Sequence, residues 1–158
     1  MFALGDAGFF GSMGGRALAA PVVGVAASLD GAGYWLVAAD GGVFAFGDAG
    51  FFGSMGGRAL SAPVVGVAAS LDGAGYWLVA ADGGVFAFGD AGFFGSMGGR
   101  ALAAPVVGVA ASPDGAGYWL VAADGGVFAF GDAGFFGSMG GRALAAPVVG
   151  VAASLDGA

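Results

Sequence analysis

Residues 33–49, GYWLVAADGGVFAFGDA, form the stretch of sequence that decides the expected fold. Residues 34–39 and 43–47 are two short runs rich in aromatic and β-branched side chains, and Asp40-Gly41-Gly42 separates them. Glycine tolerates the positive φ of a tight hairpin turn, so the pattern predicts two antiparallel strands. Both alternating faces of these strands are apolar, which predicts a sheet that is covered on both sides.

The same stretch recurs with a period of 42 residues, as the equivalent positions Phe2, Phe44, Phe86 and Phe128 show. We divide the 158-residue chain into one repeat domain with units 2–43, 44–85, 86–127 and 128–158, the last incomplete. Two further strands are predicted in each unit, at residues 22–28 and 51–55 in the first full set. Frequent glycines, 37 in all, argue against helix.

The expected fold class is therefore all-β, as a β-propeller-like array of four-stranded antiparallel blades. The repeat length falls in the range of about 40–45 residues typical of propeller blades, and stacked blades cover both faces of each sheet. A β-solenoid or an open array of stacked sheets is the alternative. The second strand occurs only three times (Tyr34, Tyr76, Tyr118). We therefore expect a fragment of a longer array, or a chain that self-associates through its open edge.

Residues 28–35, SLDGAGYW, resemble the Asp-box hairpin of many β-propellers, although the glycines stand at the fourth and sixth positions of the motif. The whole unit is similar to tandem repeats of secreted and cell-wall-associated proteins from high-GC bacteria. That resemblance implies an extracellular accessory region and brings no known activity with it. Met1 to Asp6 has no secretory signal, which we attribute to a missing N-terminus.

Composition excludes several classes of function. The net charge is −7 and each repeat has a single Arg, so we expect neither a nucleic-acid partner nor an anionic membrane surface. No uncharged stretch reaches the roughly 20 apolar residues of a membrane-spanning helix. The chain has no Cys, His or Lys, which excludes thiolate or imidazole metal sites and the usual nucleophilic triads. No cofactor is expected.

Two sets of charged residues are candidate binding sites. The four Gly-Gly-Arg loops could bind an anion or an acidic glycan, although pairing with Asp or simple solvation is the alternative. Their arginines are Arg16, Arg58, Arg100 and Arg142. Asp30, Asp40 and Asp48 offer oxygen ligands for calcium. The favoured interpretation is instead that each carboxylate caps its own turn by accepting hydrogen bonds from nearby backbone N–H groups.

Two further hypotheses concern catalysis and sugar stacking. Asp40 and Asp48 would be the carboxylate pair of a hydrolase if they met across the hairpin, but catalytic pairs need two different environments, which near-identical repeats disfavour. The tryptophans are either sugar-stacking platforms or buried packing, and the mid-strand position of each favours packing. They are Trp35, Trp77 and Trp119.

The sequence thus predicts a non-catalytic structural or binding repeat scaffold of a secreted or cell-surface protein. The alternatives are a propeller that binds cell-wall carbohydrate and a self-assembling β array. The expected partners are a polysaccharide, another protein chain or further copies of the chain itself.

Overall fold

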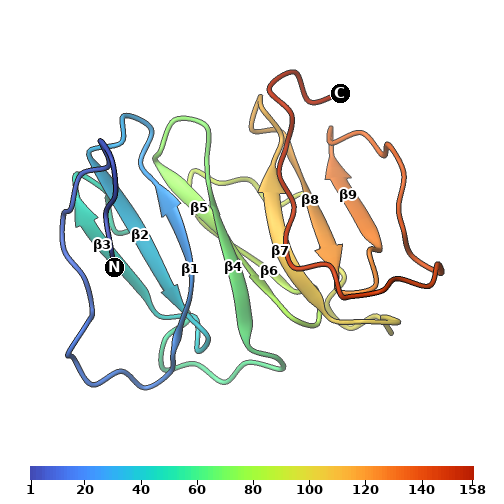
Figure 1. Cartoon of the computed structure of the whole chain (residues 1–158), viewed down its shortest axis with the longest axis horizontal. Coiled ribbons are helices and arrows are strands. Elements are labelled where there is room, and N and C mark those ends of the chain that lie inside the picture. The colour runs from blue at the N-terminus through green and yellow to red at the C-terminus, as the bar shows by residue number, and fades with distance from the viewer.

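The computed structural model describes all 158 residues as nine β-strands with no helix. They form three separate three-stranded antiparallel sheets, which follow one another along the chain (Figure 1). The strands of the first sheet are β1 (Val22–Ala27), β2 (Gly33–Ala38) and β3 (Val43–Gly47). Those of the second are β4 (Val64–Ala69), β5 (Gly75–Ala80) and β6 (Val85–Gly89). Those of the third are β7 (Val106–Ala111), β8 (Gly117–Ala122) and β9 (Val127–Gly131).

The central strand of each sheet is buried along its whole length. In the first sheet Trp35 on β2 lies opposite Ala26 on β1 and Ala45 on β3, so a large side chain is flanked by two small ones. The predicted Asp-Gly-Gly hairpin is confirmed, since β2 pairs with β3 and Gly41 has φ of 80°. The all-β prediction is confirmed as well.

The central strands are buried on both faces as predicted, and successive sheets pack face to face, so that the middle sheet has a neighbouring sheet on each side. Trp35 and Val37 of the first sheet share a buried cluster with Tyr76 of the second, and Trp77 and Tyr118 repeat this contact one unit later. The first strands β1, β4 and β7 lie beside one another in Figure 1. Glycines allow this close approach.

The glycines concerned are Gly24 and Gly66. A Cβ on Gly24 would lie 3.6 Å from the Cα of Gly66. The sheets therefore come closest where their first strands carry no side chain.

The predicted fourth strand at residues 51–55 is wrong, and the units are three-stranded. Gly53 has φ of 132°, which breaks an extended ladder. Met55 N–H donates to Gly41 C=O at 2.9 Å, whereas Phe52 N–H donates to a tyrosine hydroxyl. Four-stranded blades are therefore absent. Residues 1–5 and 148–153 also form no strand, because no second strand lies beside them.

No helix in the structure has the length and apolar character needed to cross a membrane.

Candidate functional site

The most specific arrangement in the molecule lies at the junction between one repeat and the next. Trp35 Nε1 donates to Gly50 C=O at 2.6 Å. The hydroxyl of Tyr76, from the following sheet, donates to Gly53 C=O at 2.6 Å and accepts from Phe52 N–H at 3.0 Å. Residues 50–53 are therefore held from both sides. We call this arrangement the Trp–Tyr clamp, and residues 50–53 with their equivalents 8–11, 92–95 and 134–137 the junction segments.

The clamp recurs with the same geometry. At the next junction Trp77 Nε1 donates to Gly92 C=O at 2.6 Å. The Tyr118 hydroxyl donates to Gly95 C=O at 2.6 Å and accepts from Phe94 N–H at 3.1 Å. Tyr34 binds residues 10 and 11 in the same way, at 3.0 and 2.6 Å. Every side-chain nitrogen and oxygen that is buried in the structure has a hydrogen-bond partner.

Aromatic rings surround each clamp tyrosine. The Tyr76 ring centroid lies 5.6 Å from that of Trp35, 5.8 Å from that of Phe52 and 5.7 Å from that of Phe88, all tilted. Tilted contacts at this spacing are favourable beyond the area they bury. The junction glycine is required here, because a Cβ on Gly53 would lie 2.5 Å from Cδ1 of Phe88.

Burial sets the ionisation of these tyrosines. Desolvation raises the pKa of Tyr76 and of Tyr118 above the ordinary value of 10.0, while the hydrogen bonds to the junction segments lower it in part. The neutral hydroxyl that donates and accepts is thus the form favoured by folding.

One polar pocket adjoins the complete junction at Gly92, and another adjoins the equivalent segment that begins at Gly134. One, of about 180 Å³, is lined by Ser70, Asp72, Trp77, Asp90 and Asp114 among others. The other, of about 210 Å³, has the equivalent residues of the following unit. These are Ser112, Asp114, Trp119, Asp132 and Asp156.

Two carboxyl groups meet in the second pocket. Ser112 Oγ lies 2.8 Å from Asp114 Oδ1 and 3.1 Å from Asp132 Oδ1. The hydrogen bond between the two carboxyls lowers the pKa of Asp114 and raises the pKa of Asp132. The pair is open to solvent.

The structure places the predicted aspartates differently from the proposed hydrolase pair. Asp48 lies beside Asp30. The hydrogen bond from Ala32 N–H is the largest cause that lowers the pKa of Asp30, and the hydrogen bond with Asp48 is the second largest. Asp40 instead caps the β2–β3 turn by accepting from Gly42 N–H at 2.9 Å. The Asp40–Asp48 pair is therefore wrong.

The carboxylates of Asp30 and Asp40 each cap their own turn. Asp30 accepts from Ala32 N–H at 3.0 Å and from the Ser28 hydroxyl at 3.1 Å, which confirms the favoured capping role. The structure has no group of three or more His, Cys, Asp or Glu arranged to hold a metal ion. Calcium binding by Asp30, Asp40 and Asp48 stays an untested prediction.

The tryptophans and arginines considered as binding residues lie where a role without a ligand predicts, the tryptophans inside the core and the arginines on the surface. The tryptophans are buried, so they are packing residues and not exposed platforms for sugar rings. The four arginines stand on exposed turns, and anion binding by them stays a prediction. They are Arg16, Arg58, Arg100 and Arg142.

The hydroxyls of the clamp tyrosines are functional groups that the sequence predictions missed. Tyrosine is the only aromatic residue of the central strand with a hydroxyl, and it follows the Phe-Phe-Gly triplet at constant spacing. That constant spacing was the available signal. In comparisons with known proteins, no family model matches this chain, and no curated protein matches it.

Proposed function

We propose that the chain is a non-catalytic structural and binding repeat scaffold of a secreted or cell-surface protein. The observation that carries the proposal is the Trp–Tyr clamp, which joins the segment after one sheet to the central strand of the next. A chain of weakly coupled sheets would bend at each linker. The clamp fixes each linker on both sides and so makes the array stiff.

The chemistry of the charged groups supports a role without catalysis. The aspartates accept hydrogen bonds from the backbone and serine hydroxyls of their own turns, and the same caps recur in unit after unit. These are the contacts of turn formation. The similarity of the unit to tandem repeats of cell-wall-associated proteins supports the proposed location.

A propeller-like arrangement of the sheets is part of the proposal. First strands that meet at glycines come close together, while third strands such as β3 carry large Phe side chains. This difference in bulk gives each unit a wedge shape, which is the shape that closes a ring of blades when enough units are present.

Binding of a cell-wall polysaccharide is the second candidate function. The polar pockets along successive units favour it, because each is lined by three aspartates and a serine, whose oxygens can bind a polyhydroxylated ligand. Equally spaced weak sites gain avidity when the ligand is itself repetitive and spans them.

A distance measurement tests the scaffold role. Donor and acceptor fluorophores attached at residues 12 and 154 should report one narrow distance distribution by single-molecule energy transfer. Tyr76→Ala, which removes one clamp, should broaden that distribution. A broad distribution in the unaltered chain would contradict a stiff scaffold.

Co-sedimentation with purified cell-wall polysaccharide tests the second candidate. Asp72→Asn with Asp114→Asn should reduce binding if the junction pockets hold the ligand. Replacing all four arginines by Ala is the matched control on exposed loops. Loss of binding only in the arginine variant would move the site to the Gly-Gly-Arg loops.

A further inference from the structure

Most of the aspartates gather at one end of the sheets. Asp30 and Asp48 meet where the β1–β2 turn lies beside the end of β3. In the following units the equivalent residues line the polar pockets described above, and we call this side of the array the aspartate end. These residues are Asp72, Asp90, Asp114, Asp132 and Asp156. The aspartate end repels an anionic ligand.

The arginine turns lie at the opposite end, which is formed by the β2–β3 hairpin and its equivalents and which we call the hairpin end. Arg58 N–H donates to Met55 C=O at 3.0 Å, and Met55 N–H donates to Gly41 C=O in the hairpin at 2.9 Å. The same two hydrogen bonds recur for Arg100 and for Arg142. No arginine side chain forms a hydrogen bond or an ion pair in the structure, so each guanidinium is free to bind a carboxylate.

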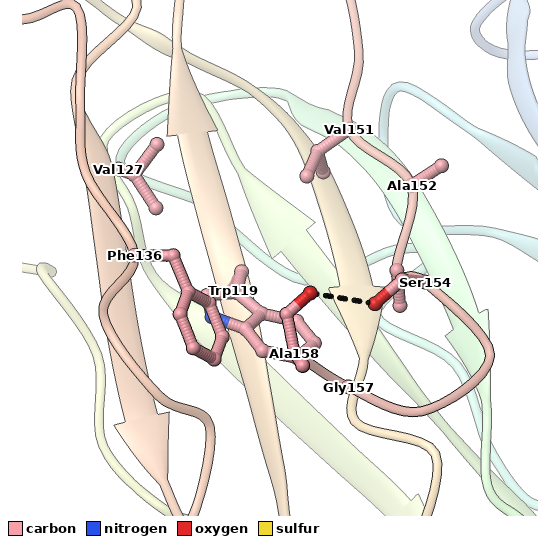
Figure 2. Close-up of a pocket in the computed structure, with 9 residues that line it drawn as sticks. Trp119, Val127, Phe136, Val151, Ala152, Ser154, Gly157 and Ala158 are labelled. Atoms are coloured by element: carbon pink, nitrogen blue, oxygen red, sulfur yellow. Dashed lines mark hydrogen bonds between the residues drawn. The ribbon is translucent and has the colours of Figure 1, made fainter.

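Each Phe-Phe pair turns one ring inward and one ring outward. Phe52 and Phe94 pack on the clamp tyrosines, with ring centroids 5.8 and 5.7 Å apart. Phe136, the equivalent residue of the third unit, borders the same pocket as Trp119 (Figure 2). The first residue of each pair is outward and has nearly the same exposure in every unit. The exposed fractions are 63% for Phe51, 62% for Phe93 and 63% for Phe135. A further sheet follows the first two of these residues, so the exposure belongs to the repeat itself.

An outward ring shares a groove with two arginine turns. The groove has a volume of about 370 Å³, and Phe128 and Phe135 line it. Ala101 and Gly141 line it as well, and each of them is the direct sequence neighbour of an arginine. Asp124 also lines the groove, but its carboxylate accepts from a backbone N–H of its own hairpin at 2.9 Å. The groove therefore combines an apolar wall with two free positive charges at its rim.

The arrangement around this groove repeats along the array. Met97 N–H donates to Gly83 C=O at 2.9 Å, as Met139 N–H does to Gly125 C=O at 2.9 Å one unit later. Each arginine turn is thus fixed to its hairpin in the same way. Outward rings and arginine turns consequently recur in successive units of the array.

We propose that the hairpin end binds an acidic polysaccharide. The apolar faces of its sugar rings pack on the outward phenylalanines, which removes exposed aromatic surface from water. Its carboxylates bind the arginine guanidinium groups, whose paired donors match a carboxylate. The separation of charge sets the orientation, because the aspartate end repels the same polymer.

The repeated structure selects a polymer over a small ligand. One arginine and one phenylalanine per unit bind weakly, and equally spaced units bind a repetitive chain together with higher avidity. This site is separate from the polar pockets proposed above for a polyhydroxylated ligand, since those pockets lie at the aspartate end.

The proposal rests on the scaffold function, because a stiff array holds successive sites at fixed spacing. The test passes the whole 158-residue chain over immobilised polygalacturonate in a surface plasmon resonance experiment. Binding should be saturable and should weaken as salt is added. The methyl ester of the same polymer keeps the sugar rings but has no charge, so it should bind about tenfold more weakly.

Protein variants locate the site. Arg58→Gln with Arg100→Gln should weaken binding by about tenfold, because two charged partners of the polymer are lost. Phe51→Ala with Phe93→Ala should weaken it by about fivefold, because less apolar surface is buried. Leu71→Ala is the matched control, since Leu71 is an apolar residue that is 56% exposed on a turn at the aspartate end. It should change binding by less than about twofold. Circular dichroism checks that all three variants keep the β-fold.

Absence of saturable binding to polygalacturonate, or equal binding to its methyl ester, would overturn the proposal. Equal binding to polyglutamate would also overturn it, since that polymer has the carboxylates without sugar rings. A phenylalanine variant that binds as tightly as the parent chain would have the same meaning. The scaffold function is tested separately by the distance distribution within one chain. Failure of polymer binding with a narrow distribution would therefore reject only the polysaccharide site at the hairpin end.

Discussion

Trp35 and Tyr76 come from two different sheets, yet their ring centroids lie 5.6 Å apart and their polar atoms bind the same four-residue segment. Trp35 holds its first residue, Gly50, and Tyr76 holds Phe52 and Gly53. One aromatic pair therefore carries both the apolar packing and the backbone hydrogen bonds between units. This relationship makes the junction the place where substitutions are most informative.

Loss of the Tyr76 hydroxyl should destabilise the chain. Tyr76→Phe keeps the ring but leaves Phe52 N–H and Gly53 C=O without their partner, at a cost of about 2 kcal/mol. Thermal unfolding followed by circular dichroism should show a lower Tm. Phe51→Ala is the control, because Phe51 is 63% exposed and its removal should change the Tm little. Equal Tm values for Tyr76→Phe and the parent chain would mean that the hydrogen bonds contribute nothing.

Addition of a methyl group at Gly53 should be more damaging. Gly53 has φ of 132°, and its new Cβ would meet the Phe88 ring at 2.5 Å, so Gly53→Ala should cost about 2–4 kcal/mol. Gly150→Ala is the matched control, since no atom lies within 4 Å of its Cβ position and its φ is not in the left-handed region. Urea unfolding of both variants compares the two sites. A Gly53→Ala chain as stable as Gly150→Ala would show that the junction segment is loosely held.

Alkaline pH should weaken the junctions. The pKa of Tyr76 and of Tyr118 is raised in the folded chain by desolvation, so the neutral side chains contribute stability that is fully present below pH 10.0. That contribution is lost as the pH rises above 10.0 and through the folded-state pKa. Ultraviolet absorbance at about 295 nm, recorded with circular dichroism, should show tyrosine ionisation accompanied by loss of β-structure. Ionisation without unfolding would contradict the proposed role of the hydroxyls.

The four arginines should be dispensable for folding. Each side chain lies on an exposed turn, so replacing all four by Ala should leave the Tm within a few degrees of that of the parent chain. The measurement is thermal unfolding at moderate ionic strength. A large loss of Tm would show that the Gly-Gly-Arg loops make structural contacts between units.

Most of the regular structure could be predicted from sequence, because local patterns determine it. Residues 43–47 are a strand with the predicted bounds, since the glycines of the hairpin fix where the strand begins. The central strand starts at Gly33 and not at Tyr34, one residue earlier than predicted. In these strands the residue composition and the turn residues at the ends predict the same structure.

The junction could not be predicted because its partners are far apart in the chain. Residues 51–55 have strand composition, but the N–H of Phe52 binds a hydroxyl 24 residues later and no neighbouring strand. Likewise, Asp48 lies beside Asp30 and not beside Asp40. The pairing of Gly33 with Gly47 brings the turn that precedes β2 next to the end of β3. Such contacts follow from sheet pairing and stacking, which a local pattern does not encode.

Coupling between the repeats is the central claim, and equilibrium unfolding in urea followed by tryptophan fluorescence tests it most directly. If the Trp–Tyr clamp joins the sheets, the chain should unfold in one transition with an m-value that corresponds to all three sheets. Tyr76→Ala should split this transition or lower the m-value, because the first sheet then unfolds separately. Separate transitions in the unaltered chain, or an m-value unchanged by Tyr76→Ala, would contradict the account.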